Sequence, residues 1–351
     1  MRRFIFPLAA ILVLPLTLAL RKTEPAGVQL RKSAGAFLDT LNDEQRRDVL
    51  FEYAAKERTA WHFIPKDDRK GMPLSKMDDA QRAAALRLVR AGLSQIGYEK
   101  TRRVRLAEAI VAKLEGKGRR WPRDPELYYV TLFGKPTDDA SQEPWALSFE
   151  GHHISLNFVI RGDQVVDSTP QFFGAHPARI PKGYDGNWAW GDRVLPEEED
   201  LGFKLIGSMG SSDRKLAIFA EKAPKEVRFA GDAQAAVDAE AVGIAWGELN
   251  RDQQETLKQL VLTYTDVAAP EVAKARRKRI EQDGWETLHF GWAGAVEPGT
   301  GHYYRIRAPS FLIELVNTQP DAMGNPANHM HCFFRDLTGD FDLPPAEPSA
   351  Q

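Results

Sequence analysis

The same order of helix-like and strand-like segments occurs twice along these 351 residues. In each half, segments with apolar residues at helical spacing precede several runs that are rich in β-branched and aromatic residues. Strands that follow one another through short turns pair as antiparallel meanders. The sequence therefore predicts an α+β fold in which two similar helix-plus-antiparallel-meander halves, about 41–200 and 245–342, form one compact unit.

The first half opens with three predicted helices. Asn42 or Asp43 is a natural N-cap for the first helix, which ends before Pro65 because the residue preceding a proline is disfavoured in helical dihedrals. A second helix begins near Met77, and a third covers about 101–114. We expect these helices to cover one face of the meander that follows.

Strand-like runs follow the helices in both halves. In the first half, Gly162-Asp163 separates two of these runs as a hairpin turn does. The second half begins at 249–254, where the order Leu-Asn-x-x-Gln of 41–45 occurs again at the start of a predicted helix. A basic helix then spans about 270–282. The predicted strands lie at 127–133, 145–149, 154–160 and 165–166, and again at 287–294, 303–307, 311–316 and 329–335.

An ungapped alignment relates the strands of the two halves. Placing Ser148–Gly151 against Arg305–Ala308 superimposes two strand pairs and sets Asn157 beside Glu314. Few residues are identical between the aligned segments, so coincidence is the alternative explanation. Internal duplication is therefore a hypothesis that accounts for the repeated order of elements.

Composition indicates a globular protein that does not bind nucleic acid. With 43% hydrophobic residues, the chain can bury one large core or two smaller ones. The 47 basic and 49 acidic residues give a formal charge of −2, which provides no overall field for a polyanion. We expect a globular domain at 41–342, between a linker at 23–40 and a disordered tail at 343–351.

The N-terminus has the pattern of an export signal. Met1–Arg3 supplies positive charge, and residues 4–20 are mostly apolar. Residues 1–22 are therefore predicted to be a signal peptide or an N-terminal membrane anchor, since Arg21-Lys22 could leave the segment uncleaved. The protein would be periplasmic, extracellular or tethered, and it would contact a membrane only through this segment.

A single cysteine, Cys332, rules out a disulfide within the chain. An exported form would then be held together by its core or by a metal ion. On a strand, the side chain of Cys332 points away from those of His329 and His331. We therefore interpret it as a small buried apolar group, with metal ligation as the alternative.

Two histidines near the C-terminus are the strongest candidate metal ligands. His329 and His331 are two residues apart on a predicted strand, so both imidazoles point to one face and can converge on one ion. A hydrolytic zinc site needs a third protein ligand and an open position for water. Glu314 lies in an otherwise apolar strand and is a candidate third ligand or general base. His289 and His302 are further options.

A second histidine pair follows another predicted strand. His152 and His153 are neighbours, so in an extended chain they face opposite ways, and at most one shares a face with Glu150. A bulge at Gly151 would change this. We expect one of the two histidines to be a site residue and the other to be a structural hydrogen-bonding group. For both pairs, satisfying buried polar groups is the alternative role.

Three arginines near these pairs could bind an anionic substrate. The planar guanidinium suits a carboxylate or phosphate, although ordinary salt bridges are the alternative. Two charged runs, 197–200 and 276–279, are interpreted as solvated surface, with cation binding as the alternative for the acidic one. The three arginines are Arg305, Arg307 and Arg335.

An irregular aromatic segment, 169–196, separates the halves. It contains too many apolar residues for a solvated linker and is too irregular for a sheet, so we expect a functional loop packed over the site. Its residues Trp188 and Trp190 could stack on a sugar or a peptide. Packing as a lid without any ligand is the alternative.

Several motifs together resemble a known family. The resemblance is to the uncharacterised bacterial and fungal family catalogued as domain of unknown function 3500, and it runs from about Leu41 to Asp342. It implies that the histidine motifs form one unit, and it implies no activity. Ala308-Pro309 replaces the Gly-Pro that is usual there. The motifs are Trp61–Pro65, Glu150–Phe158, Phe172–Ala175, His289–Gly294, Tyr304–Ile306, and Asn328–His331 with Arg335-Asp336.

No sequence motif with a fixed mechanism is present, because the chain lacks a Gly-x-Ser-x-Gly elbow, a phosphate loop, a His-Glu-x-x-His helix and a dinucleotide fingerprint. The favoured prediction is a metal-dependent hydrolase that uses a divalent transition metal, with zinc as one candidate. Its ligand would be a small molecule, a sugar or a peptide. The alternative is a non-catalytic periplasmic or cell-surface protein that binds a metal ion, a sugar or a peptide. The predicted metal ligands are His329, His331, His152 and His153. The predicted catalytic residues are Glu314, Glu150 and Arg335, with Glu314 or Glu150 as the general base.

Overall fold

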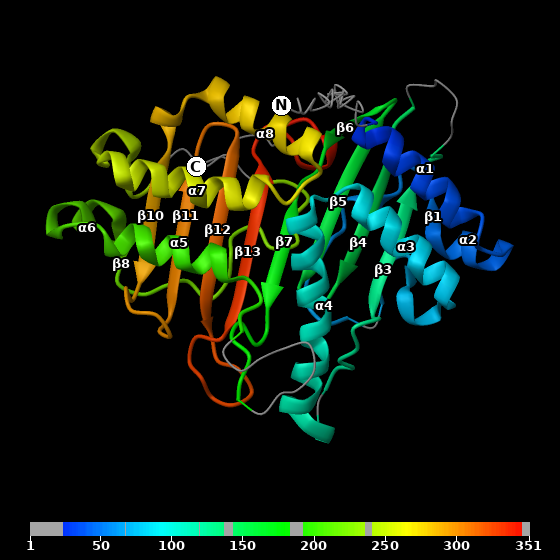
Figure 1. The fold of residues 1–351 in the computed structure, drawn as a ribbon, viewed down its shortest axis with the longest axis horizontal. Helices are drawn as coiled ribbons and strands as arrows, with labels where there is room; N and C mark the ends of the chain where they lie inside the picture. Colours follow the sequence, from blue (N-terminus) through cyan, green and yellow to red (C-terminus); the bar gives the residue numbers. More distant parts are fainter. Residues whose placement is uncertain are drawn as a thin grey trace, which may run out of the picture.

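The computed structural model describes residues 24–66, 68–118, 120–136, 143–182, 192–235 and 241–345. Within these ranges, 13 strands form one mixed sheet with the central order β1-β3-β4-β5-β7-β13-β12-β11-β10-β8. Figure 1 shows the chain running through one half of this sheet and then through the other. No helix in the described ranges is sufficiently long and apolar to cross a membrane.

The elements begin and end as follows. The α-helices are α1 (Ala26–Leu38), α2 (Asp43–Val49), α3 (Asp79–Ala91), α4 (Gln95–Glu115), α5 (Pro196–Gly207), α6 (Ser211–Ala217), α7 (Arg251–Thr265) and α8 (Pro270–Asp283). The strands of the first half are β1 (Leu50–Phe51), β2 (Met72–Pro73), β3 (Tyr128–Phe133), β4 (Trp145–Gly151), β5 (Ile154–Arg161), β6 (Gln164–Asp167) and β7 (Gln171–Ala175). Those of the second are β8 (Ile218–Ala220), β9 (Ile244–Ala245), β10 (His289–Gly294), β11 (His302–Arg307), β12 (Phe311–Gln319) and β13 (His329–Asp336).

Helices cover one face of the sheet. Figure 1 shows α1, α3 and α4 in front of the first half, and α5, α7 and α8 in front of the second. The large core lies between these layers and includes Leu156, Leu315 and Phe334. Capping boxes at the starts of α2, α3 and α7 fix where those helices begin. The expected α+β architecture is confirmed.

Irregular segments cover the other face, where a second core forms. Trp61 and Phe63 from the segment before β2 pack with Phe172 of β7 and Phe333 of β13. Because strand side chains alternate between faces, this loop-covered face also receives His331 and Arg335 of β13. The side chains of His329 and His331 therefore lie on the face that the helices do not cover.

The two halves share their strand registers. Ser148 pairs with Asn157 between β4 and β5, and Arg305 pairs with Glu314 between β11 and β12, as the ungapped alignment requires. At one end of the sheet β1 pairs in parallel with β3, and at the other end β8 pairs in parallel with β10. The duplication itself stays a hypothesis, while the common order of elements is a property of the fold.

Two segments differ from their sequence-based assignments. Residues 26–38, predicted to be linker, form α1 because Leu30 and Phe37 make an apolar stripe that is fully buried. Residues 171–175, predicted to be loop, form β7, which joins the two halves between β5 and β13. All five residues of β7 are buried, so the strand lacks the alternation that would have identified it.

The charged runs are also less exposed than their composition indicates. Glu198, in the first turn of α5, is buried and accepts a 2.6 Å hydrogen bond from Lys100. Arg276 on α8 donates to Gln171 and Ser168. The interpretation of both runs as solvated surface is wrong for these two residues. The predicted signal or anchor at 1–22 lies outside the described residues, as do Trp188, Trp190 and the end of the predicted tail.

Candidate metal centre

His152 and His153 form the turn of the β4–β5 hairpin. Gly151 pairs with Ile154, which leaves the two histidines as the connecting residues. His153 has a φ of 65°, a left-handed conformation that is uncommon outside glycine. The two histidines are therefore not in the extended geometry in which they would face opposite ways, because a two-residue turn and not a strand presents both rings.

Backbone contacts hold His153 in this conformation. Its N–H donates to the Phe63 carbonyl at 2.9 Å, and its own carbonyl accepts from the Gly174 N–H at 2.8 Å. Gly174 also leaves room for the imidazole, since a Cβ at this position would come within 2.7 Å of the His153 ring. The turn is thus fixed by both neighbouring segments, as strained functional residues are.

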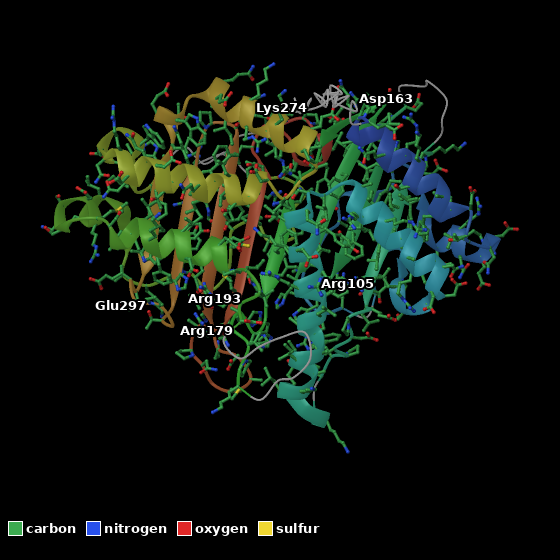
Figure 2. All side chains as sticks on the ribbon, viewed as in Figure 1. Arg105, Asp163, Arg179, Arg193, Lys274 and Glu297 are labelled. Atoms are coloured by element: carbon green, nitrogen blue, oxygen red, sulfur yellow. The ribbon has the colours of Figure 1, made fainter. Side chains whose placement is uncertain are left out.

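His329 and His331 reach the same point from β13. His331 is opposite Gly174 of β7 and Val316 of β12, whereas His329 is opposite Gln319. Asn328 anchors the start of the strand by donating to the Arg179 carbonyl at 3.1 Å and accepting from the Arg179 N–H at 2.7 Å. Figure 2 shows Arg179 near the lower end of the sheet, where β13 begins.

The three Nε2 atoms of His153, His329 and His331 form a small triangle. The His153–His329 distance is 2.9 Å, and His331 lies 3.2 Å from each of the others. Imidazoles bound tetrahedrally to zinc at about 2.05 Å hold their nitrogens about 3.3 Å apart. The triangle therefore has the size of a three-histidine metal site, and these three residues form one group of candidate ligands.

Burial favours the neutral, metal-binding form of two of these rings. It lowers the pKa of His153 and of His329 well below the ordinary value, and the neighbouring histidines lower both further. His153 and His331 are 2% and 4% exposed, while His329 is half-buried. The triangle is thus closed on most sides and open beside His329.

A carboxylate selects the tautomer of His331. Nδ1 of His331 lies 2.8 and 2.9 Å from the two carboxylate oxygens of Glu226. An Nδ1–H that donates to this carboxylate leaves the Nε2 lone pair directed at the triangle. Carboxylates commonly orient metal-bound histidines in this way.

Aromatic rings enclose the triangle. Phe63 stacks on Phe172 at 3.9 Å and meets the His331 ring edge-on at 4.8 Å. His176 stacks on His329 at 4.3 Å. Burial, more than any neighbouring charge, lowers the pKa of His176 to about 4. Phe63 and Phe172 form an apolar wall beside His331, and His176 covers the ring of His329.

His152 lies beside the triangle and not in it. Its ring stacks on His153 at 3.7 Å, and Nδ1 contacts Glu108 of α4 at 2.5 Å. Arg123 lies 3.1 Å from the same nitrogen and forms a two-pronged ion pair with Glu115 at 2.7 and 2.8 Å. Burial lowers the pKa of His152, and Glu108 opposes this shift.

The two carboxylates predicted as general bases have partners of their own. Glu314 is fully buried, accepts from the backbone N–H and Nε of Arg228, both at 3.1 Å, and accepts from the Tyr303 hydroxyl. Burial raises the pKa of Glu314 despite Arg228. Glu150 accepts from Lys70 at 2.8 Å and from Ser148 at 3.0 Å. A role as base for either carboxylate stays a prediction.

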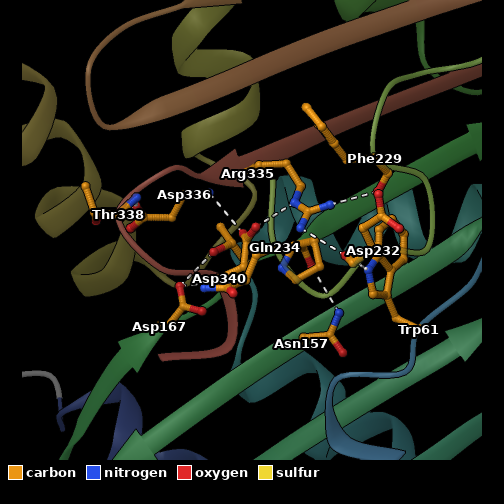
Figure 3. Close-up of polar contacts among 12 residues, drawn as sticks. Trp61, Asn157, Asp167, Phe229, Asp232, Gln234, Arg335, Asp336, Thr338 and Asp340 are labelled. Atoms are coloured by element: carbon orange, nitrogen blue, oxygen red, sulfur yellow. Dashed lines mark hydrogen bonds and ion pairs between the residues drawn. The ribbon is translucent and has the colours of Figure 1, made fainter. Parts of the chain in front are cut away.

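Arg335 connects the sheet to the segment that covers it. Its guanidinium donates to Asp340 at 2.6 Å and to the carbonyls of Phe229 and Asp232 at 3.0 Å, as Figure 3 shows. Arg305 lies on β11, two strands from β13, above the ring of Phe219. Arg307 is also on β11. Substrate binding by Arg305 and Arg307, and catalysis by Arg335, stay predictions.

The remaining candidates lie elsewhere. His302 stacks on Trp292, and His289 contacts the Thr287 carbonyl. Cys332 is buried in the helix-side core, opposite Phe173. Neither histidine belongs to either of the two groups of candidate ligands found among the described residues, which are His153 with His329 and His331, and His153 with His152 and Glu108.

Comparison with known proteins assigns a family. Residues 24–343 match the model of a family described as a protein of unknown function, DUF3500. The chain belongs to this family. Searches of the curated proteins and of the solved structures gave no match. The family therefore covers the whole described fold, α1 included, and leaves its activity to be argued from the site.

Several residues that contact the histidines in this DUF3500 protein were not predicted from the sequence. Glu226, Glu108 and Arg123 reach the histidines from segments that are distant in sequence, and no motif marks them. His176 lies in the segment 169–196, for which the sequence predicted only an aromatic loop. The one available signal was the Gly-His-His sequence between two strand-like runs, whose length fits a two-residue turn.

Proposed function

We propose that this protein is a metal-dependent hydrolase in which His153, His329 and His331 bind one divalent transition ion. The supporting observation is the triangle of Nε2 atoms with sides of 2.9, 3.2 and 3.2 Å. An Nε2–H of one ring can donate to a neighbouring Nε2, but among three such nitrogens at least one contact stays unpaired, whereas a cation between three lone pairs satisfies all of them. Zinc accepts this ligand set and geometry.

The number of ligands favours catalysis over storage. Among the described residues, this group comprises three histidines, and a second group of candidate ligands, Glu108, His152 and His153, shares His153 with it. Structural zinc sites have four protein ligands, whereas catalytic sites keep one position for water. The half-buried His329 marks the side from which water and substrate would enter.

An ion held in this way would supply the nucleophile. Zinc lowers the pKa of bound water to about 7, so that hydroxide is available at neutral pH. The protein would contribute the fixed triangle, the Glu226 contact that orients His331, and the apolar wall of Phe63 and Phe172. A water-excluding wall of this kind strengthens the electrostatic interaction between the ion and a substrate carbonyl.

The metal content of untagged protein tests the proposal. We expect about one transition ion per chain by mass spectrometry, lost in His331→Ala and His329→Ala and kept in His289→Ala. Chelation should lower Tm and zinc should restore it, because a ligand that binds only the native state stabilises it. Protein that neither contains nor takes up an ion would overturn the proposal. An ion that binds without hydrolysis of any ester, amide or phosphoester would favour the non-catalytic alternative.

A further inference from the structure

His176 is buried beside the candidate metal centre without a hydrogen bond. It is 7% exposed, and neither of its ring nitrogens has a partner. Within the described ranges, buried side-chain atoms without a partner also occur on Asn157, Glu198 and His302, but each of these side chains makes a hydrogen bond through its other polar atom. A buried imidazole without any partner lowers stability, so it marks a position where a bound atom would be received.

The backbone fixes His176 to the strand that carries two of the candidate ligands. Ala175, the residue before it, pairs with Met330 of β13. Two residues after it, the Ala178 N–H donates to the Asn328 carbonyl at 2.9 Å. The imidazole is therefore held beside the start of β13 from both directions along the chain.

The ring of His176 lies parallel to that of His329, with 4.3 Å between the ring centroids and 4° between the planes. A metal-binding lone pair lies in the plane of its imidazole, so two parallel rings at this separation cannot direct their nitrogens at one tetrahedral ion. His176 is accordingly in neither group of candidate ligands in the described part of the chain. It is a neighbour of the metal centre and not a fourth ligand.

The open position of an ion in the triangle would be within reach of His176. The triangle is open beside His329, which is the ligand on which His176 stacks. An oxygen in the open position would lie about 2.1 Å from the ion, and an N–H group donates to such an oxygen across about 2.8 Å. Together these two lengths span the 4.3 Å separation of the rings.

An ion in the triangle would also keep His176 neutral. A buried cation disfavours a second positive charge beside it, so an imidazolium is unfavourable at this position when the ion is bound. A neutral imidazole has one N–H donor and one lone pair. Its N–H is then available to an oxygen that carries negative charge on the ion.

We infer that His176 is a catalytic residue that donates a hydrogen bond to the oxygen atom in the open position of the ion. The hydrogen bond requires only the ion, whereas its part in catalysis rests on the proposed function.

In the hydrolysis of an ester or amide, this hydrogen bond would stabilise the transition state. The oxygen of water forms a bond to the carbonyl carbon, the carbonyl oxygen gains negative charge, the C–O or C–N bond breaks, and a proton of the water ends on the released alcohol or amine. His176 donates to the charged oxygen and keeps its own proton, and nothing is oxidised or reduced. One preorganised donor of this kind contributes about 100-fold to kcat.

Acetohydroxamate binding to cobalt-loaded protein tests the hydrogen bond. Cobalt(II) absorbs visible light, so the binding of this oxygen ligand at its open position can be titrated. His176→Phe keeps a flat ring against His329 and removes both nitrogens. We expect this variant to hold one cobalt ion per chain and to bind acetohydroxamate about tenfold more weakly than the unsubstituted protein. Unchanged affinity would overturn the inference and leave His176 with a packing role.

His176→Gln and His302→Phe are the matched variants. A glutamine amide also carries an N–H donor, so His176→Gln should recover part of the affinity. His302 is likewise buried, has an unpartnered Nε2 and stacks on Trp292, but it lies outside the candidate ligand groups, so His302→Phe should leave the affinity unchanged. Equal weakening in His176→Phe and His302→Phe would overturn the inference. A second cobalt ion per chain that is lost in His176→Phe would overturn it too, because His176 would then be a metal ligand.

Stability in chelator gives a readout that needs no metal. His176→Phe should be at least as stable as the unsubstituted protein in urea, since it keeps the stacked ring and removes two unpaired buried nitrogens. A His176→Phe protein that is clearly less stable in chelator would show that these nitrogens have structural partners, which would overturn the inference.

Hydrolysis of para-nitrophenyl acetate separates the inference from the proposed function. In zinc-loaded protein, His176→Phe should lower kcat about 100-fold and change KM little. Weaker acetohydroxamate binding in His176→Phe, combined with no hydrolysis by any form, would support the hydrogen bond and contradict the hydrolase. Hydrolysis unaffected by His176→Phe would support the hydrolase and overturn the catalytic role of His176. Protein that takes up no cobalt would overturn both.

Discussion

Two hairpin turns occupy equivalent places in the two halves of the sheet and carry different chemistry. In the β4–β5 hairpin, Gly151 and Ile154 close a turn made of His152 and His153. In the β11–β12 hairpin, Ala308 donates to the Phe311 carbonyl at 3.1 Å, and this contact closes a turn made of Pro309 and Ser310. The registers on either side of the two turns also agree, since Ser148–Asn157 in the first corresponds to Arg305–Glu314 in the second.

The surroundings of the two turns correspond as well. The His153 carbonyl accepts from the Gly174 N–H at 2.8 Å, and the Ser310 carbonyl accepts from the Leu337 N–H at 2.9 Å. A helix carboxylate contacts each turn: Glu108, within α4, reaches His152, and Asp283, the last residue of α8, accepts from the Ser310 N–H at 3.0 Å. The two turns therefore share their backbone contacts, and only the first of them carries imidazoles.

The neighbouring strands explain why only the first turn gathers ligands. The start of β13 brings His329 and His331 to the His152–His153 turn. At the second turn, Ser310 lines a cavity of about 310 Å³ with Ser168 and Arg276. The fold therefore contains two turns with similar backbone contacts, and the side chains at the β4–β5 turn form the candidate metal site.

Replacing His153 by serine, the residue at the equivalent position of the second turn, is expected to have the largest effect on zinc affinity. His153→Ser removes one of three ligands, so the affinity for zinc should fall about 100-fold or more. Ser310→Ala, at the equivalent position, should leave the affinity unchanged. Competition with a zinc-binding dye measures both variants. Equal effects at the two turns would break the comparison.

Gly174 should tolerate substitution less well than its counterpart Leu337, which already carries a side chain. Gly174→Ala would place a Cβ within 2.7 Å of the His153 ring, so the free energy of unfolding should fall by about 1–3 kcal/mol and zinc affinity should fall with it. Gly207→Ala is the control, because no atom lies within 4 Å of its added Cβ. Urea denaturation measures both, and a Gly174→Ala protein as stable as Gly207→Ala would contradict the packing described.

Glu226 distinguishes the first turn through its contact with His331. Glu226→Gln should lower zinc affinity about 10- to 100-fold, because the amide no longer provides a charged acceptor for the imidazole N–H. The folded state should keep its stability in chelator, since Glu226 is only partly buried. Glu221→Gln, at an exposed carboxylate of the same segment, is the control. Dye competition showing equal affinities for these two variants would argue against the orienting role.

A smaller, pH-dependent effect on the free energy of unfolding is expected for the loop before β13. Burial alone would raise the pKa of Asp321, but hydrogen bonds from Asn325 and Asn328 outweigh burial and hold it below the ordinary value. A depressed folded-state pKa contributes stability that is present above about pH 4 and is lost as pH falls through the folded pKa. Asp321→Asn should therefore lower stability by about 1 kcal/mol at pH 7 and flatten the acid limb. Urea titrations between pH 2 and 7 in chelator measure this, and parallel curves for the two proteins would contradict it.

Periodic segments were predictable from the sequence, and segments without periodicity were not. Helices such as α7, which has a capping box, and α8, which begins at Pro270, lie close to their expected positions, as do strands such as β4 and β5, because apolar spacing and turn residues mark them. The strand β7 was not recognised, since a strand buried on both faces shows no alternation. The short α2 ends at Val49, well before the proline that was expected to end it.

The candidate site was predictable where local geometry decides it. The spacing of His329 and His331 on one strand required their rings to share a face, and the two rings do so. His153 joined them through a turn conformation that strand alternation could not indicate. Glu226 comes from more than 100 residues away along the chain, and such tertiary contacts leave no trace in one sequence.

X-ray absorption spectroscopy of the zinc-loaded, untagged protein tests the central claim most directly. The account predicts one ion per chain with three imidazole nitrogens and one additional oxygen at about 2.0–2.1 Å. The same measurement on His153→Ser should show the loss of one imidazole or of the ion. A first shell without imidazole nitrogens, or with a sulfur ligand from Cys332, would contradict the account.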